Sequence, residues 1–217
     1  MVALTRQAVL RAALSTLDDV GLDRLTLQRI AKKLDVQTPA LYWHFKNKQQ
    51  LLDHMADELV RSQFEDFGLP SPEQSWDRWL TELSRRIYRT LLSHRDGARL
   101  FAGSHLQHGF AQRSIDNMLT VLQRAGFSAF DALVAGVTVV NYATGTVMEQ
   151  QSIQNTQLPA KGGKGQPEPT ETPEALDQLS DEEKVALFNP DVMFEHGLQL
   201  LINGLRTRVP AATSTEE

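Results

Sequence analysis

The chain of 217 residues is 41% hydrophobic and 23% charged, which is ordinary for a soluble globular protein of one or two domains. It contains no cysteine, so disulfides, thiolate catalysis and cysteine-ligated zinc are excluded. The net charge of −5 argues against nucleic acid as a partner of the whole chain. However, residues 1–48 carry eight Lys or Arg and four Asp, a net +4, which leaves −9 for the remainder. This uneven distribution indicates that only the N-terminal part meets a polyanion.

The N-terminus does not have the pattern of a secretory signal, because Thr5, Arg6 and Gln7 interrupt its apolar residues. We therefore expect a cytoplasmic location. Residues 132–148 carry no charge, but the segment is short and contains Gly, Thr and Asn. We do not expect it to span a membrane.

Apolar residues recur at helical spacing along the chain, and no alternating strand pattern stands out, which predicts an all-α fold. The first helix has an apolar stripe formed by Val9, Ala13, Leu17 and Val20. Gly21 follows this stripe and can end the helix with a left-handed cap.

A helix-turn-helix is predicted at residues 26–48, which read TLQRIAKKLDVQTPALYWHFKNK. Thr26 is expected to cap a short helix, a tight turn follows, and Thr38 is expected to cap a second short helix. Leu41 and Phe45, four residues apart, are expected to face the core. A helix of this size fits a DNA major groove, which is about 12 Å wide.

The second helix of this motif presents side chains that suit DNA. Thr38 can bond base edges or phosphates, Ala40 can contact a thymine methyl, and Tyr42 and His44 can reach phosphate oxygens. For Trp43 two interpretations stay open, contact with DNA and packing within the small N-terminal domain. The candidate DNA-binding residues are Thr26, Gln28, Gln37, Thr38, Pro39, Ala40, Tyr42, Trp43, His44, Lys46 and Lys48.

Asn47 is expected to cap a fourth helix that runs from Lys48 to about Phe64. After a break at 68–70, residues 71–74 have the pattern of a capping box and predict the start of the next helix. The buried stripe of that helix would be Trp76, Leu80, Leu83, Ile87 and Leu91.

A further helix over residues 115–122 should stop at Gly126, and a long one should run from 128 to about 151. The long helix is apolar nearly all round, so it must be buried in the core or in a subunit interface. From there we expect, in chain order, a flexible loop at 154–174, helices at about 172–187 and 190–208, and a disordered tail at 210–217.

The stretch LTLQRIAKKLDVQTPALYWHFKNKQQLLD resembles the signature of the TetR family of bacterial repressors throughout, and SWDRWL and LLSHRDGARLFAG resemble the C-terminal domain of its tetracycline-binding members. The resemblance implies an all-α homodimer, with a helix-turn-helix head at 1–47, a linker helix, and a ligand-binding and dimerisation domain at 48–209. It implies no enzymatic activity. It implies binding to a palindromic DNA operator, dimerisation through two long C-terminal helices per subunit, and release by a small molecule that moves the fourth helix. Such repressors often control an export pump and antibiotic resistance.

The sequence departs from the tetracycline-binding members where they hold the drug. Those members have a metal-binding His at the position of Phe101 and a drug-contacting His at that of Phe64, and only Glu149 matches their magnesium site. We therefore expect no metal or other cofactor, and an apolar or aromatic, polyketide-like effector. The candidate ligand-binding residues are Phe64, Phe67, Leu83, Ile87, Phe101, Ser104, His105, Met118, Val137, Asn141 and Glu149. Core packing without a ligand is the alternative for the apolar residues of this set.

Two other classes of function are alternatives to a ligand-responsive repressor. For an enzyme, His105 and His108 could share a helix face but have no clear third metal ligand, and residues 162–165 lack the spacing of a phosphate loop. The other class is a DNA-binding regulator gated by a protein partner, or not gated at all. An internal cavity of a few hundred Å³ would favour a small-molecule effector over that alternative.

Overall fold

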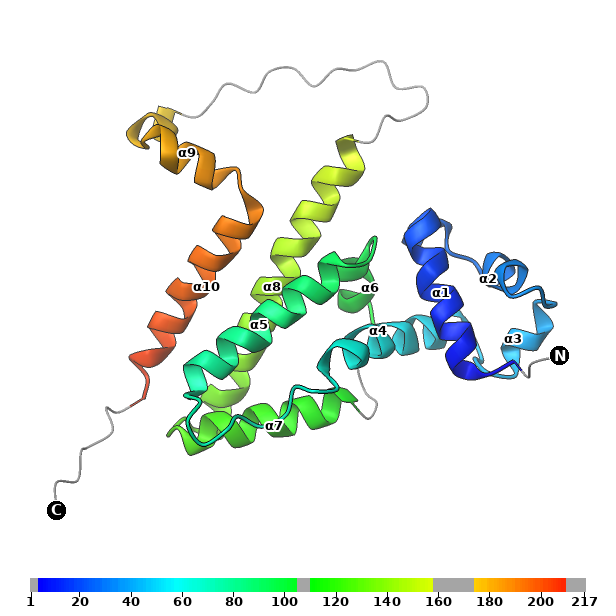
Figure 1. The fold of residues 1–217 in the computed structure, drawn as a ribbon, viewed down its shortest axis with the longest axis horizontal. Coiled ribbons are helices and arrows are strands. Elements are labelled where there is room, and N and C mark those ends of the chain that lie inside the picture. The colour runs from blue at the N-terminus through cyan, green and yellow to red at the C-terminus, as the bar shows by residue number, and fades with distance from the viewer. Residues whose placement is uncertain (1–3, 105–109, 158–173, 210–217) are drawn as a thin grey trace.

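A computed structural model describes residues 4–104, 110–157 and 174–209, and within them the chain forms only helices. They are α1 (Arg6–Val20), η1 (Leu22–Arg24), α2 (Leu27–Lys33), α3 (Pro39–Tyr42), α4 (Lys48–Phe64), α5 (Trp76–Leu92), α6 (Gly97–Ala102), α7 (Phe110–Arg124), α8 (Ala129–Gln157), η2 (Glu174–Gln178), α9 (Asp181–Leu187) and α10 (Pro190–Arg206). The predicted all-α fold is confirmed. Figure 1 shows α1–α3 as a head at one end, with α4 leading from it into a body built from α5, α7, α8 and α10.

The head folds around a small apolar core that is closed by capped helices. The side chains of Thr5, Thr26 and Asn47 each accept a backbone N–H in the first turn of α1, α2 and α4. These bonds satisfy donors that a helix start leaves without a partner. Leu41 and Phe45 are buried, as their spacing predicted, so the opposite face of α3 is directed outward.

The centre of the body is the contact between α5 and α8. Leu80 and Leu91 of α5 are fully buried there. Gln151 of α8 is also buried, and its amide donates to the carbonyls of Leu91 and His94 at 3.0 and 2.9 Å. The same side chain accepts the N–H of Ala98 at 3.2 Å. Gln151 therefore ties α8 to the turn between α5 and α6.

That turn also holds the head against the body. Asp96 is buried and has a left-handed backbone, with φ of 54°, and its Oδ2 accepts the backbone N–H of Leu22 in the head at 2.8 Å. Arg99 forms an ion pair with Asp23 of the head at 2.8 Å. The backbone N–H of Arg95 donates to Asp18 at the end of α1, at 3.1 Å. The head is thus connected to the body by polar contacts as well as by α4.

The start of α5 differs from its prediction. Residues 71–74 form a turn, in which the N–H of Gln74 donates to the carbonyl of Ser71 at 3.0 Å, and no capping box. The helix begins at Trp76, after an extended Ser75 that makes no side-chain cap. The short helix α6 was not predicted, because six residues are too few for a readable apolar period.

The segments around the predicted flexible loop also need correction. α8 continues to Gln157, so the first residues of the loop predicted at 154–174 are helical. The rest of that loop, 158–173, and the tail at 210–217 lie outside the described residues. The helix predicted at 172–187 is divided into η2 and α9, because Ser180 and Glu183 form a capping box that starts a new helix.

α8 is long and apolar enough to cross a membrane by length and composition alone, over Ala129–Gln154. In this fold it packs against α5, α7 and α10, so it is the central helix of the body. The body leaves a further apolar face exposed, most of it on α8 and α10. Its exposed side chains are Phe130, Leu133, Val134, Val137, Met148, Val192, Met193 and Leu200.

Candidate functional site

The outward face of α3 and its flanks forms the first candidate site. Thr38 stands at the start of α3 but makes no side-chain cap there, contrary to the expectation, and its backbone is helical. Tyr42 is 53% exposed and Trp43 is 90% exposed. The packing interpretation of Trp43 is therefore wrong, because a ring that anchors a core cannot be almost fully solvent-exposed.

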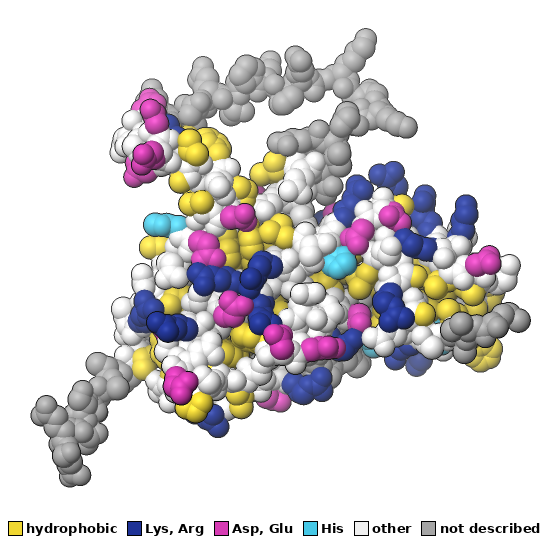
Figure 2. All heavy atoms as spheres, in the orientation of Figure 1, with side chains coloured by type: hydrophobic (Ala, Val, Ile, Leu, Met, Phe, Trp, Pro, Cys, Tyr) yellow, Lys and Arg dark blue, Asp and Glu magenta, His cyan; other side chains and the backbone are white. Residues whose placement is uncertain are grey.

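The other candidate DNA-binding residues also reach the surface of the head. Thr26, Gln28, Gln37, Pro39, Lys46 and Lys48 are exposed, whereas Thr38, Ala40 and His44 are half-buried. Figure 2 shows Lys and Arg side chains gathered over the head, the part predicted to be basic. The structure thus brings the predicted residues to one exposed end of the molecule.

Lys33 joins two helices of the head, and Lys48 contributes to the electrostatic potential of the head. Lys33 donates to Ser15 and forms an ion pair with Asp19 at 2.8 Å, so it joins α2 to α1. The pKa of Asp23 lies below its ordinary value, mainly because Arg99 hydrogen-bonds and attracts its carboxylate, with a smaller contribution from Lys48. Lys48 is therefore close enough to the head to contribute to the same surface potential.

A cavity of about 320 Å³ lies in the body and forms the second candidate site. It is lined by α4, α5, α7 and α8, with Phe101 from α6, and it is open to solvent at the exposed side chains of Ile115 and Val137. Its lining residues are Asp57, Val60, Phe64, Leu83, Ile87, Phe101, Ser114, Ile115, Met118, Gly136, Val137, Val140 and Asn141. Because α4 both lines this cavity and leads to the head, a molecule bound here would contact the helix that positions the head.

Seven of the eleven predicted ligand-binding residues line this cavity, namely Phe64, Leu83, Ile87, Phe101, Met118, Val137 and Asn141. Phe67 lies outside it and stacks on Trp79, with ring centroids 5.3 Å apart. Ser104 donates to the carbonyl of Phe101 rather than lining the cavity, and Glu149 is exposed on α8. His105 lies outside the described residues, as do His108 and residues 162–165.

Sequence reasoning missed part of the lining. Asp57 and Val60 lie seven and four residues before Phe64, so the helical period of α4 could have placed them on the same face. Gly136 could not have been found that way. A Cβ at Gly136 would lie 1.5 Å from the sulfur of Met118, so this glycine lets α7 approach α8 closely.

Among the described residues that line the cavity, Asp57 is the one carboxylate and none is a histidine. Phe101 and Phe64 contribute only phenyl rings, which have no atom that can bind a metal ion. Across the described residues, no group of three or more His, Asp or Glu side chains could hold a metal ion. One carboxylate and the two neutral polar side chains of Ser114 and Asn141 therefore form no such cluster for a magnesium-bound ligand.

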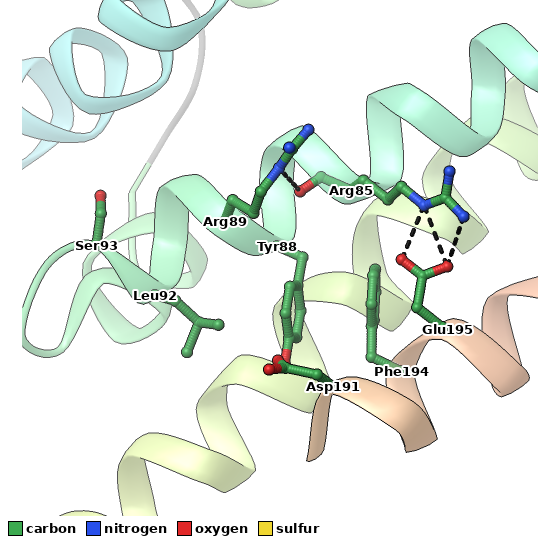
Figure 3. A pocket seen from close by; sticks show the side chains of 8 residues that line it. All are labelled: Arg85, Tyr88, Arg89, Leu92, Ser93, Asp191, Phe194 and Glu195. Atoms are coloured by element: carbon green, nitrogen blue, oxygen red, sulfur yellow. Dashed lines mark hydrogen bonds and ion pairs between the residues drawn. The ribbon is translucent and has the colours of Figure 1, made fainter. Parts of the chain in front are cut away.

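A second hollow, of about 490 Å³, lies between α5 and α10 and is shown in Figure 3. Arg85 and Glu195 form a two-pronged ion pair across it, with a shortest distance of 2.6 Å. Tyr88 stacks on Phe194 at 3.9 Å, and its hydroxyl donates to Asp191 at 2.6 Å. Burial and this hydrogen bond raise the pKa of Tyr88 to about 12. These contacts hold α10 against α5 and thereby fix the exposed apolar face beside it.

Comparisons with known proteins place this architecture in a family. The family described as "Bacterial regulatory proteins, tetR family" matches residues 9–55. The family described as "Tetracyclin repressor-like, C-terminal domain" matches residues 69–209. The chain is 36% identical to the tetracycline repressor protein class A from transposon 1721 of Escherichia coli, over 96% of this chain and 93% of that protein.

Two solved structures extend the comparison. TetR (class A) in complex with 5a,6-anhydrotetracycline and magnesium is 32% identical, with a TM-score of 0.70, and covers 94% of this chain and 99% of its own. BioQ with its double-stranded DNA operator is 30% identical, with a TM-score of 0.66, and covers 94% of this chain and 98% of its own.

The fold, the helix-turn-helix head and the cavity define a ligand-responsive transcriptional repressor that binds a DNA operator. The chain belongs to the TetR family of bacterial regulators, with a tetracycline-repressor-like C-terminal domain. The predicted family is confirmed. Because the family consists of transcriptional repressors, the expectation that the chain is not an enzyme is confirmed as well.

Proposed function

We propose that the chain is a homodimeric, cytoplasmic repressor that binds an inverted-repeat operator and is released by a small apolar or aromatic effector without magnesium. The observation that carries this proposal is the apolar cavity against α4. A ligand that binds one arrangement of α4 more tightly shifts the population of head positions toward it. A polyketide-like aromatic compound fits the lining, and an export pump is the proposed regulated function.

The head supports binding in the major groove. α3 is the exposed helix of the motif, and Thr38, Ala40 and Tyr42 lie on or beside it. Lys46 and Lys48 flank it and add sequence-independent attraction to phosphates. Base contacts by α3 and phosphate contacts by its flanks together account for a sequence-specific operator.

The exposed apolar face of α8 and α10 supports dimerisation. Leu200 is 63% exposed and Val134 is 46% exposed, in a set too large for a typical monomer surface. A second copy applied through a two-fold axis would cover this face with the same face. Phe194, Leu198 and Ile202 of α10 do not belong to this face, because they are buried inside their own subunit.

The composition of the cavity argues against magnesium–tetracycline as the effector. Phe64, Leu83 and Met118 present hydrocarbon or thioether surface where a polar drug would need hydrogen-bond partners. A polar group of a ligand placed against these three side chains would lose its hydrogen bonds to water without replacement, which costs about 1–3 kcal/mol for each group. An aromatic effector incurs no such cost along most of its surface.

Gating by a protein partner is the alternative, and the cavity disfavours it. A body that responds only to a surface partner has no need for an apolar pocket of about 320 Å³ beside the linker helix. The test is selection of binding sequences from random DNA by the purified protein, followed by a titration of the selected complex with aromatic compounds. We expect an inverted repeat with half-sites about one helical turn (~34–36 Å) or a multiple apart. Selection of asymmetric sequences would contradict the dimer, and an unresponsive complex would favour the protein-partner alternative.

A further inference from the structure

The mainly apolar cavity beside α4 is lined by one acidic side chain, that of Asp57. Among the lining residues that the structure describes, Asp57 is the one ionisable group, and Ser114 and Asn141 are the other polar side chains. No Lys or Arg lines this cavity in the described part of the chain. A carboxylate surrounded by phenyl and aliphatic side chains gives the cavity a negative charge at one wall.

The position of Asp57 on α4 is fixed by the helix. Asp57, Val60 and Phe64 are spaced by three and four residues, which places them on one face, and all three line the cavity. Val60 and Phe64 are buried, so this face is held against the body. Asp57 takes part in an interaction within the protein. A carboxylate has about four lone-pair sites, so it can accept a further N–H from a ligand.

The charged neighbours outside the cavity do not remove this feature. Arg61, one turn along α4, forms ion pairs with Glu58 at 2.8 Å and Glu65 at 2.5 Å. Arg113 lines a separate hollow between α4 and α7 and not this cavity. Neither arginine is among the described residues that line this cavity.

We propose that the effector of this repressor is a lipophilic cation, an aromatic compound with a basic nitrogen whose N–H groups bind the carboxylate of Asp57. This inference rests on the proposed function and specifies the effector class. The aromatic part of the ligand lies among the apolar side chains, and the rings of Phe64 and Phe101 add cation–π attraction. An anionic compound of the same shape is repelled by Asp57.

A ligand contact with Asp57 would also affect the position of the head, because Asp57 lies on α4. Asp57 lies nine residues beyond Lys48, which is about 14 Å along the helix at 1.5 Å per residue. A cation held between Asp57 and the wall formed by α8 joins the middle of α4 to the body. Because α4 is continuous to Asn47, its displacement at Asp57 moves the start of the helix next to α3.

The test uses matched pairs of probes that differ only in charge. The probes are 9-(aminomethyl)anthracene against 9-anthracenemethanol, and 1-(aminomethyl)naphthalene against 1-naphthalenemethanol. In each pair the cationic amine and the neutral alcohol have the same number of heavy atoms. Dissociation constants are measured by fluorescence on the DNA-free, full-length protein, because such aromatic compounds also bind DNA. We expect the amine of at least one pair to bind about tenfold more tightly than its alcohol, as a charge-assisted hydrogen bond implies.

The variant Asp57→Asn keeps the shape of the side chain and should abolish this preference while leaving the affinity for the alcohol within about twofold. Asp53→Asn is the matched control. It removes the same charge one turn earlier on α4, where the carboxylate accepts from Gln49 at 2.9 Å outside the cavity, so the preference should persist. Thermal unfolding of each variant verifies its fold.

Equal binding of amine and alcohol by the native protein would overturn the cation inference and leave the proposed apolar effector intact. Loss of both ligands in Asp57→Asn, with the fold retained, would assign Asp57 a structural role and also overturn it. Failure of all four probes to bind would reject the cavity as an effector site and the proposed function with it.

Discussion

Lys48 is the residue through which the charge of the head can be tested in isolation. It is exposed at the first position of α4, beside the recognition surface. The substitution Lys48→Ala should weaken binding to all DNA sequences to a similar extent. In a dimer it should also lower the slope of log affinity against log salt by about two, because each head gives up one phosphate contact. Anisotropy titrations of labelled DNA over a range of salt concentrations measure both effects, and an unchanged slope would exclude Lys48 as a phosphate contact.

Thr38 should behave differently, because its hydroxyl lies at the start of the exposed helix and makes no capping bond. Thr38→Val conserves shape and removes the hydroxyl. We expect it to cost about 1–3 kcal/mol at one operator position, with little change on other sequences or in the salt slope. Competition binding with operators substituted base by base measures this, and a uniform loss on every sequence would assign Thr38 to phosphate contact instead.

At the residue level the sequence predicted much of both candidate sites. Leu41 and Phe45 were placed in the core by spacing alone, and resemblance brought Phe64 and Phe101 to one cavity. Asp57 was missed because the resemblance directed attention to positions that hold a drug in other family members. The helical period of α4 places Asp57 on the face of Phe64, but its position in the lining of the cavity depends on how α4 packs against the body.

Among the elements, the turn before α6 holds the head against the body through a hydrogen bond. Asp96 combines a left-handed backbone with the acceptor for Leu22 of the head. Asp96→Ala should destabilise the protein by about 2–4 kcal/mol, since it loses a charge-assisted hydrogen bond and places alanine in an unfavourable conformation. Asp96→Asn is the control and should lose less, because asparagine tolerates this backbone. Urea unfolding at one protein concentration compares them, and equal stability of native protein and Asp96→Ala would refute this role.

The dimerisation face makes a separate prediction for α10. Leu200→Glu should yield monomers and abolish operator binding, because it places a charge on the exposed apolar face of α8 and α10. Gln199→Glu adds the same charge on the neighbouring residue, which lines a hollow against α5, and should leave the dimer intact. Sedimentation at micromolar concentration distinguishes the two. A native monomer, or a dimeric Leu200→Glu variant, would contradict the proposed interface.

Helices with a long apolar period were predicted well, and short or divided ones were not. The periodicity of α5, α7 and α10 is strong because one face of each packs on the body. The start of α5 was misplaced by a Ser-Pro-Glu-Gln pattern that forms a turn, since the same residues favour both structures. The division between η2 and α9 depends on the Ser180–Glu183 capping box, a local signal that a longer apolar pattern concealed.

For the whole molecule, one continuous helix, α4, links an exposed basic head to a cavity in an acidic body. The two functions are therefore reciprocal: a ligand that lowers operator affinity must bind the operator complex more weakly by the same factor. A near-complete switch from 1:99 to 99:1 requires a ligand that favours the released state by about 5.5 kcal/mol.

The most direct test of this account is a titration of the preformed protein–operator complex, followed by the anisotropy of labelled operator DNA. One arm adds aromatic ligands without metal, and the other adds tetracycline with and without magnesium. We predict release by an aromatic ligand that is unaffected by magnesium. For an uncharged aromatic ligand, release should be blunted by Leu83→Asp, which places an unpaired charge in the cavity wall. Magnesium-dependent release by tetracycline at sub-micromolar concentration, with no response to metal-free aromatic compounds, would contradict it.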